Sequence, residues 1–144
     1  MMKKLVYYID KGFGNYEAFY EYAIPNVSPD EIYARQLCTY LIKDGKQYEL
    51  TYNEMYGSEE HLILKEMGYN KTDYDEKQFP KVVGIPIEFR KLGTFEEHTH
   101  LSSKVLKSHW EVIRYLLKDS IEVPEKGLFK TTSTELDEDR GCYV

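Results

Sequence analysis

The sequence predicts an α+β fold in which an antiparallel, meander-like sheet of about four to six strands carries one long helix on a face and two short helices. Two observations lead to this prediction: β-prone runs flank clear turn residues, and residues 102–118 have the strongest helical period. A third is that 42% of the 144 residues are hydrophobic, which is enough for one core. No repeat is recognisable. We therefore expect one domain over residues 1–132, followed by an acidic tail over residues 133–144.

The first 24 residues predict a β-hairpin. Residues 3–10 and 16–24 are rich in Leu, Val, Ile and Tyr, and the turn-forming sequence K-G-F-G-N separates them. Two strands joined by a loop of five residues satisfy this pattern.

A helix is expected from Ser28 to about residue 39. Ser28 can accept a hydrogen bond from a free backbone amide, Pro29 suits the first turn, and the acidic residues after it favour the positive end of the helix dipole. Cys38 falls on the apolar face of this helix. We expect it to be a buried packing residue and not a nucleophile, because no base lies near it in the sequence.

Residues 39–52 predict a second hairpin around Asp44-Gly45. Tyr48, Leu50 and Tyr52 alternate with polar residues in its second arm, so one face of that strand should be buried.

Three weaker elements follow. Residues 58–68 predict a short helix that begins at Ser58 and ends at Gly68, with His61 solvated in its first turn. Residues 81–89 predict an edge or bulged strand, because Pro86 lacks a backbone donor. Residues 128–132 predict the last strand.

The long helix predicted over residues 102–118 would have two functionally different faces. His109 and Trp110 lie close to its apolar stripe, where they would pack. The opposite face would be basic, and the free amides of the first turn would lie near Ser102. We therefore expect a site for a phosphate-bearing ligand or an acidic partner; its residues are Ser102, Lys104, Lys107, Arg114 and Lys118.

An alternative site lies just before this helix. Glu96, His98 and His100 are two residues apart, so an extended strand would place all three on one face, where a carboxylate and two imidazoles could bind a divalent metal. This pattern indicates a small metal-dependent hydrolase or phosphoesterase. The opposing interpretation is a loop that contains histidines by accident, since no second acid or base completes the site.

Charge and composition narrow the function further. The net charge of −6, from 25 acidic and 19 basic residues, argues against a nucleic-acid-binding protein. An acidic mimic of nucleic acid is a further alternative, weakened because four acids are concentrated in residues 133–140. Two cysteines are too few for a disulfide framework, which favours a cytoplasmic protein, and no apolar run is long enough to span a membrane.

No dinucleotide, P-loop, kinase or zinc-protease motif is present, so we expect no cofactor. The 14 tyrosines suit interfaces. The sequence therefore favours a small, non-enzymatic binding or regulatory protein that contacts a protein partner or a small anionic ligand. Self-association into a homo-oligomer remains open.

Overall fold

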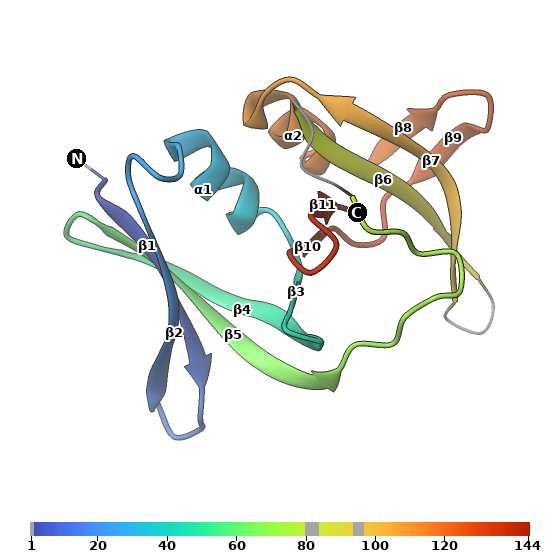
Figure 1. Ribbon diagram of the computed structural model, residues 1–144. Coiled ribbons are helices and arrows are strands. Elements are labelled where there is room, and N and C mark those ends of the chain that lie inside the picture. Colours follow the sequence, from blue (N-terminus) through green and yellow to red (C-terminus); the bar gives the residue numbers. More distant parts are fainter. Residues whose placement is uncertain (1, 80–83, 94–96) are drawn as a thin grey trace.

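The computed structural model describes residues 2–79, 84–93 and 97–144 (Figure 1). The chain is 52% strand and 12% helix, so the α+β prediction is wrong and the fold is mostly β. The strands are β1 (Lys4–Asp10), β2 (Tyr16–Ala23), β3 (Tyr40–Lys43), β4 (Lys46–Tyr56), β5 (Glu59–Tyr69), β6 (Ile85–Leu92), β7 (His98–Leu106), β8 (Ser120–Val123), β9 (Gly127–Lys130), β10 (Glu135–Asp137) and β11 (Cys142–Tyr143). The helices are α1 (Pro29–Gln36) and α2 (His109–Leu116).

One mixed sheet dominates the molecule. Its strand order is β2-β1-β5-β4-β3-β10-β11-β6-β7, and β8 and β9 form a separate hairpin. The pairs β1/β5, β3/β10 and β6/β11 are parallel and the remaining pairs are antiparallel. A meander cannot produce this order, because parallel neighbours require connections that cross over other strands.

The chain folds as two similar units, which we call the first and the second repeat. The order β1-β2-α1-β3-β4 in the first unit is matched by β6-β7-α2-β8-β9 in the second. The helices begin at Pro29 and His109, and the strands after them end at Lys43 and Val123; both pairs are 80 residues apart. The next strand also matches, since β5 pairs in parallel with β1 and β11 pairs in parallel with β6. The fold is therefore an internal repeat, which the sequence did not reveal.

Both helices begin in the same way. The Ser28 hydroxyl accepts a hydrogen bond from the Glu31 amide at 3.1 Å, and the Ser108 hydroxyl accepts one from the Glu111 amide at 3.4 Å. The helices pack against each other (Figure 1), and their residues Ile32 and Val112 belong to one continuous core with the inner face of the sheet.

The long helix expected over residues 102–118 is wrong. Its first part is strand β7, which pairs with β6 as far as Leu106, and helix α2 begins only after Ser108. The short helix expected over residues 58–68 is also wrong, because these residues form β5. Strand β5 lies between β1 and β4 and is buried continuously from Glu60 to Leu64, so its apolar residues Leu62 to Leu64 follow one another without strand alternation.

Both predicted hairpins are confirmed. β1 pairs with β2 across residues 11–15, and β3 pairs with β4 across Asp44-Gly45. Strand β6 has the predicted irregularity, with a shift in register between Phe89 and Arg90, but it lies inside the sheet and not at its edge. Among the described residues, no helix is long and apolar enough to cross a membrane.

Residues 133–144 are not a tail outside the domain. They contribute β10 and β11 to the centre of the sheet (Figure 1), where Tyr143 is 3% exposed. The turn between these strands contacts both repeats. The Asp139 carboxylate accepts hydrogen bonds from the amides of Asp44 and Gly45 at 2.7 Å each, while Arg140 donates to Glu88 at 2.9 Å.

Candidate functional site

A cavity of about 600 Å³ that is partly open to solvent lies mainly against the second repeat, and Tyr40 and Gln47 of the first repeat also line it. This volume lies within the range of about 300 to 1,000 Å³ that is typical of small-molecule sites. Strand β6, helix α2 and the β8–β9 hairpin contribute its apolar walls, and the segments 70–76 and 131–135 contribute much of its polar lining. The cavity therefore lies where elements far apart in the sequence meet.

Apolar side chains cover most of the surface provided by the regular elements. The phenyl ring of Phe89 and the phenol ring of Tyr115 pack with their centroids 5.7 Å apart. The main apolar lining residues are Ile87, Phe89, Leu101, Tyr115, Ile121 and Phe129. Leu101 reaches the cavity because it is the unpaired residue where the β6–β7 register shifts.

A network of buried charges forms another part of the lining. Glu88 is 2% exposed and its carboxylate accepts two hydrogen bonds from Arg140, at 2.9 and 3.1 Å, and one from Arg90. The Arg140 guanidinium also pairs with Asp137 at 3.0 Å and with Glu76 at 3.1 Å. Burial tends to raise the pKa of Glu88, but the hydrogen bonds from the two arginines outweigh it and lower that pKa.

The second guanidinium is equally well bonded. Arg90 pairs with Asp75 at 2.7 Å and donates to the His98 carbonyl at 2.6 Å. The other Asp75 carboxylate oxygen accepts a hydrogen bond from the His100 amide at 3.1 Å. These contacts attach the segment after β5 to the β6–β7 hairpin, so this wall of the cavity is held at several points.

Glu135 has different surroundings. It lines the cavity, and burial together with the nearby Asp137 carboxylate raises its pKa to about 7. The Arg140 guanidinium lowers that pKa to a smaller extent. Among the described residues, no side chain forms a hydrogen bond or an ion pair with the Glu135 carboxyl group. Its carboxyl group therefore lines the cavity with hydrogen-bonding capacity that the described side chains do not use.

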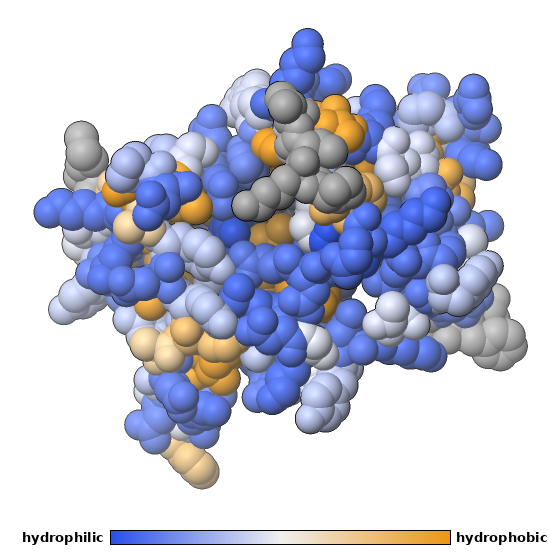
Figure 2. Space-filling model, viewed as in Figure 1, coloured by the Kyte–Doolittle hydropathy of each residue, from blue (hydrophilic) through white to orange (hydrophobic). Residues whose placement is uncertain are grey.

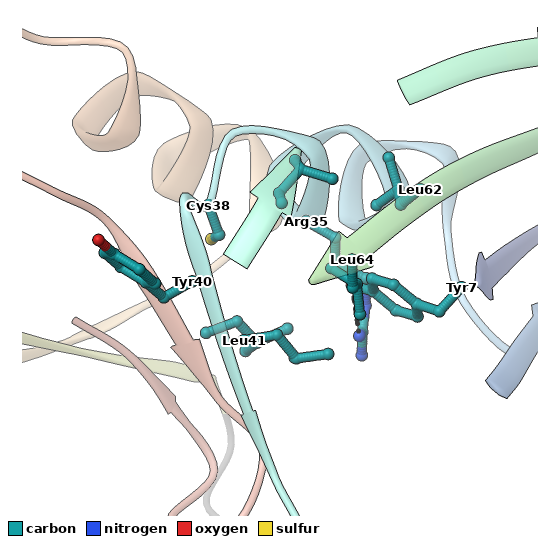
Figure 3. Close-up of a pocket in the computed structure, with 9 residues that line it drawn as sticks. Tyr7, Arg35, Cys38, Tyr40, Leu41, Leu62 and Leu64 are labelled. Atoms are coloured by element: carbon teal, nitrogen blue, oxygen red, sulfur yellow. Dashed lines mark hydrogen bonds between the residues drawn. The ribbon is translucent and has the colours of Figure 1, made fainter. Parts of the chain in front are cut away.

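The first repeat has a cavity in the equivalent place, but its volume is only about 10 Å³ (Figure 3). Residues 80 positions apart line the two cavities: Tyr7 and Ile87, Arg35 and Tyr115, Leu41 and Ile121, Leu50 and Lys130, and Leu64 and Val144. In the first repeat the long strands β4 and β5 continue across this place and fill it with leucines. In the second repeat the chain leaves β9 at Lys130 and pairs again only at Glu135, so the space stays open.

The structure separates the residues of the predicted anion site. Ser102 and Lys104 lie on β7, Lys107 lies before α2, and Arg114 lies on the helix. Lys118 follows the helix. The Lys104 ammonium donates a hydrogen bond to the Tyr115 hydroxyl at 3.1 Å. The expected stripe along one helix face is absent, and a role of these five residues in ligand binding stays a prediction.

The predicted metal residues lie partly outside the described residues, because Glu96 does. His98 and His100 are on one strand as expected, but His98 lies 4.0 Å from Asp73 while His100 forms a hydrogen bond with Ser103 at 2.8 Å. Within residues 2–79, 84–93 and 97–144, no three His, Cys, Asp or Glu side chains are grouped to hold a metal ion. Metal binding by Glu96, His98 and His100 stays a prediction.

Other expected residues have clear positions. Cys38 is buried as predicted, and burial raises the pKa of its thiol, which makes it a poor nucleophile at neutral pH. His61 is 9% exposed on β5 and lies 3.0 Å from Glu59, so the prediction of a solvated histidine is wrong. His109 packs edge-on to Tyr143 with ring centroids 5.8 Å apart, as a packing histidine would.

Sequence reasoning missed the residues that make the cavity polar. A signal for two of them exists in the run I-P-I-E-F-R, where Glu88 and Arg90 interrupt a strand that is otherwise apolar. Charges inside such a run indicate a buried pair. Arg140 and Glu135 carried no such signal, because they belong to a segment whose composition resembles an exposed tail.

The face in Figure 2 is mostly hydrophilic, and its hydrophobic residues lie in small separate groups. It therefore offers no broad apolar surface for a partner. No protein family model, curated protein sequence or solved structure matches the chain.

Proposed function

We propose that this protein is a non-enzymatic binding protein that holds a small amphipathic molecule in the cavity of its second repeat. The observation that carries the proposal is the contrast between the equivalent cavities of the two repeats. Side chains leave a volume of only about 10 Å³ in the first repeat, whereas the cavity of the second repeat has a volume of about 600 Å³. An open cavity with apolar walls sacrifices packing contacts. A ligand would restore them.

The lining supports an amphipathic ligand in particular. Phe89, Tyr115 and Phe129 offer apolar surface for the body of a molecule, while the side with Glu88, Arg140 and Glu135 offers hydrogen-bonding groups. The arginines are already paired with carboxylates, so a small anion has less support from this cavity than the sequence suggested.

The test is to fill the cavity. The variant Ile121→Trp places a larger side chain where Ile121 lines the cavity, and Ser120→Trp, its neighbour on β8 outside the lining, is the matched control. We expect small molecules that shift the NMR spectrum of the wild type to lose at least about tenfold in affinity for Ile121→Trp. Affinity for the control should not change.

Native mass spectrometry of the purified protein provides a second measurement, since a molecule retained from the cell would appear as an added mass. A ligand that binds Ile121→Trp as tightly as the wild type would show that binding occurs elsewhere, and the proposal would be wrong.

A further inference from the structure

Among the acidic residues that line the cavity, Glu135 has no basic partner within the part of the chain that the structure describes. Glu135 is held by its backbone, since its amide donates to the Val144 carbonyl at 3.0 Å and its carbonyl accepts from the Val144 amide at 2.8 Å. On its other side the backbone pairs with Tyr40 of β3. The main chain is therefore fixed by both neighbouring strands while the carboxyl group lines the cavity.

The other charges around the cavity are already paired. Arg140 forms ion pairs with three carboxylates and Arg90 with two, so neither guanidinium has a free face of the kind a carboxylate ligand would need. Lys71 and Lys130 also line the cavity, but both are exposed to solvent at its rim. The unmatched charge inside is thus negative.

We infer that the ligand of this cavity carries a protonated amine that pairs with Glu135, and that its apolar body lies against Phe89, Tyr115 and Phe129. This inference rests on the proposed function. An ammonium group would supply the missing partner of Glu135, and a neighbouring aromatic ring would favour a cation further. A neutral head group could donate a hydrogen bond but would leave the negative charge unbalanced, and an anionic head group would be repelled by it.

The inference has a consequence for pH. Asp137 lies on β10 with Glu135, Glu76 on the segment after β5 and Glu88 on β6, and their charges act with burial to raise the pKa of Glu135 to about 7. Arg140 opposes them. An amine binds the ionised carboxylate, so its affinity should fall about tenfold from pH 8 to pH 6 as Glu135 takes up a proton. An anionic ligand would show the opposite trend.

Three probes of similar size test the inference: 2-phenylethylamine, 2-phenylethanol and 3-phenylpropanoate. Their affinities are measured by NMR titration at pH 8 and pH 6. We expect the amine to bind most tightly, to lose at least about tenfold in Glu135→Gln, and to lose its pH dependence in that variant. Glu122→Gln, which removes an exposed carboxylate of β8 outside the cavity, is the matched control and should change neither result.

The possible failures are distinguishable. If the alcohol or the carboxylate binds as tightly as the amine, or if Glu135→Gln leaves amine binding unchanged while Ile121→Trp abolishes it, the cavity binds ligands but the assignment of an amine is wrong. If none of the three probes binds, or if the bound probe is indifferent to Ile121→Trp, the proposed function fails together with the inference. Near-UV circular dichroism of each variant confirms that its fold is intact.

Discussion

Glu88 is buried and Glu135 is partly buried, and their carboxyl groups are in opposite situations. Glu88 accepts hydrogen bonds from two guanidinium groups, which lower its pKa and keep it ionised at neutral pH. No guanidinium group of the described residues donates to Glu135, and its pKa is raised to about 7. One carboxylate therefore stabilises the folded chain as an ion, whereas the other destabilises it when ionised.

The pKa of Glu135 predicts a stability effect in the absence of ligand. Because its pKa is about 7 in the folded chain and 4.5 is the ordinary value, the group opposes folding most strongly above pH 7, less as the pH falls toward 4.5, and not at all below that. Glu135→Gln should thus raise the free energy of unfolding by about 2 to 3 kcal/mol at pH 8.

This gain should disappear near pH 4, which urea denaturation at the two pH values would show. Glu122→Gln, at an exposed position, should have no effect at either pH. A gain of equal size at pH 8 and pH 4 would mean that the charge of Glu135 is not its cause.

At the scale of elements, each helix depends on one capping serine. Both helices have eight residues, which is too short for stability from propensity alone. Ser28→Ala and Ser108→Ala should each lower the free energy of unfolding by about 1 kcal/mol, because an amide of the first turn loses its acceptor. Chemical denaturation measures this effect, and the exposed Ser120→Ala is the control. Losses below about 0.3 kcal/mol would show that water replaces the hydroxyls.

The same serines show what the sequence could and could not reveal. The capping serine, the proline and the acids at residues 28–31 predicted the start of α1 correctly, and Ser108 with Glu111 three residues later marks the true start of α2. Helical spacing of Leu101, Val105 and Leu106 suggested a longer helix. These residues belong to an edge strand, and the pairing with β6 that makes them a strand is not visible locally.

The hairpins were predictable because their pairing is local: the Asp44-Gly45 turn determines its own strand partners. The cavity could not be predicted from the sequence, because Glu88, Tyr115 and Glu135 meet only after the repeats have packed together. A run such as E-L-D in β10 has no sign of burial in its own composition.

At the scale of the whole molecule, the end of the described chain joins the two repeats. Strand β10 extends the sheet from β3, and β11 connects it to β6. Removal of residues 133–144 should therefore abolish cooperative unfolding. If these residues were a solvated tail, their removal would change the unfolding transition little. Urea titration followed by circular dichroism tests this expectation. A truncated chain that unfolds at the same urea concentration with the same slope would contradict the described sheet.

The position of β10 also affects how the protein is made. Strand β3 has β4 as an early neighbour, but its second neighbour begins at Glu135, which is synthesised 95 residues after Tyr40. During translation the free side of β3 stays unpaired until the ribosome has released this distant segment, and an unpaired strand edge can bind other chains. Contacts between residues so far apart in the sequence make folding slow. A chaperone that held the nascent chain until residues 135–143 emerged would therefore protect it from aggregation.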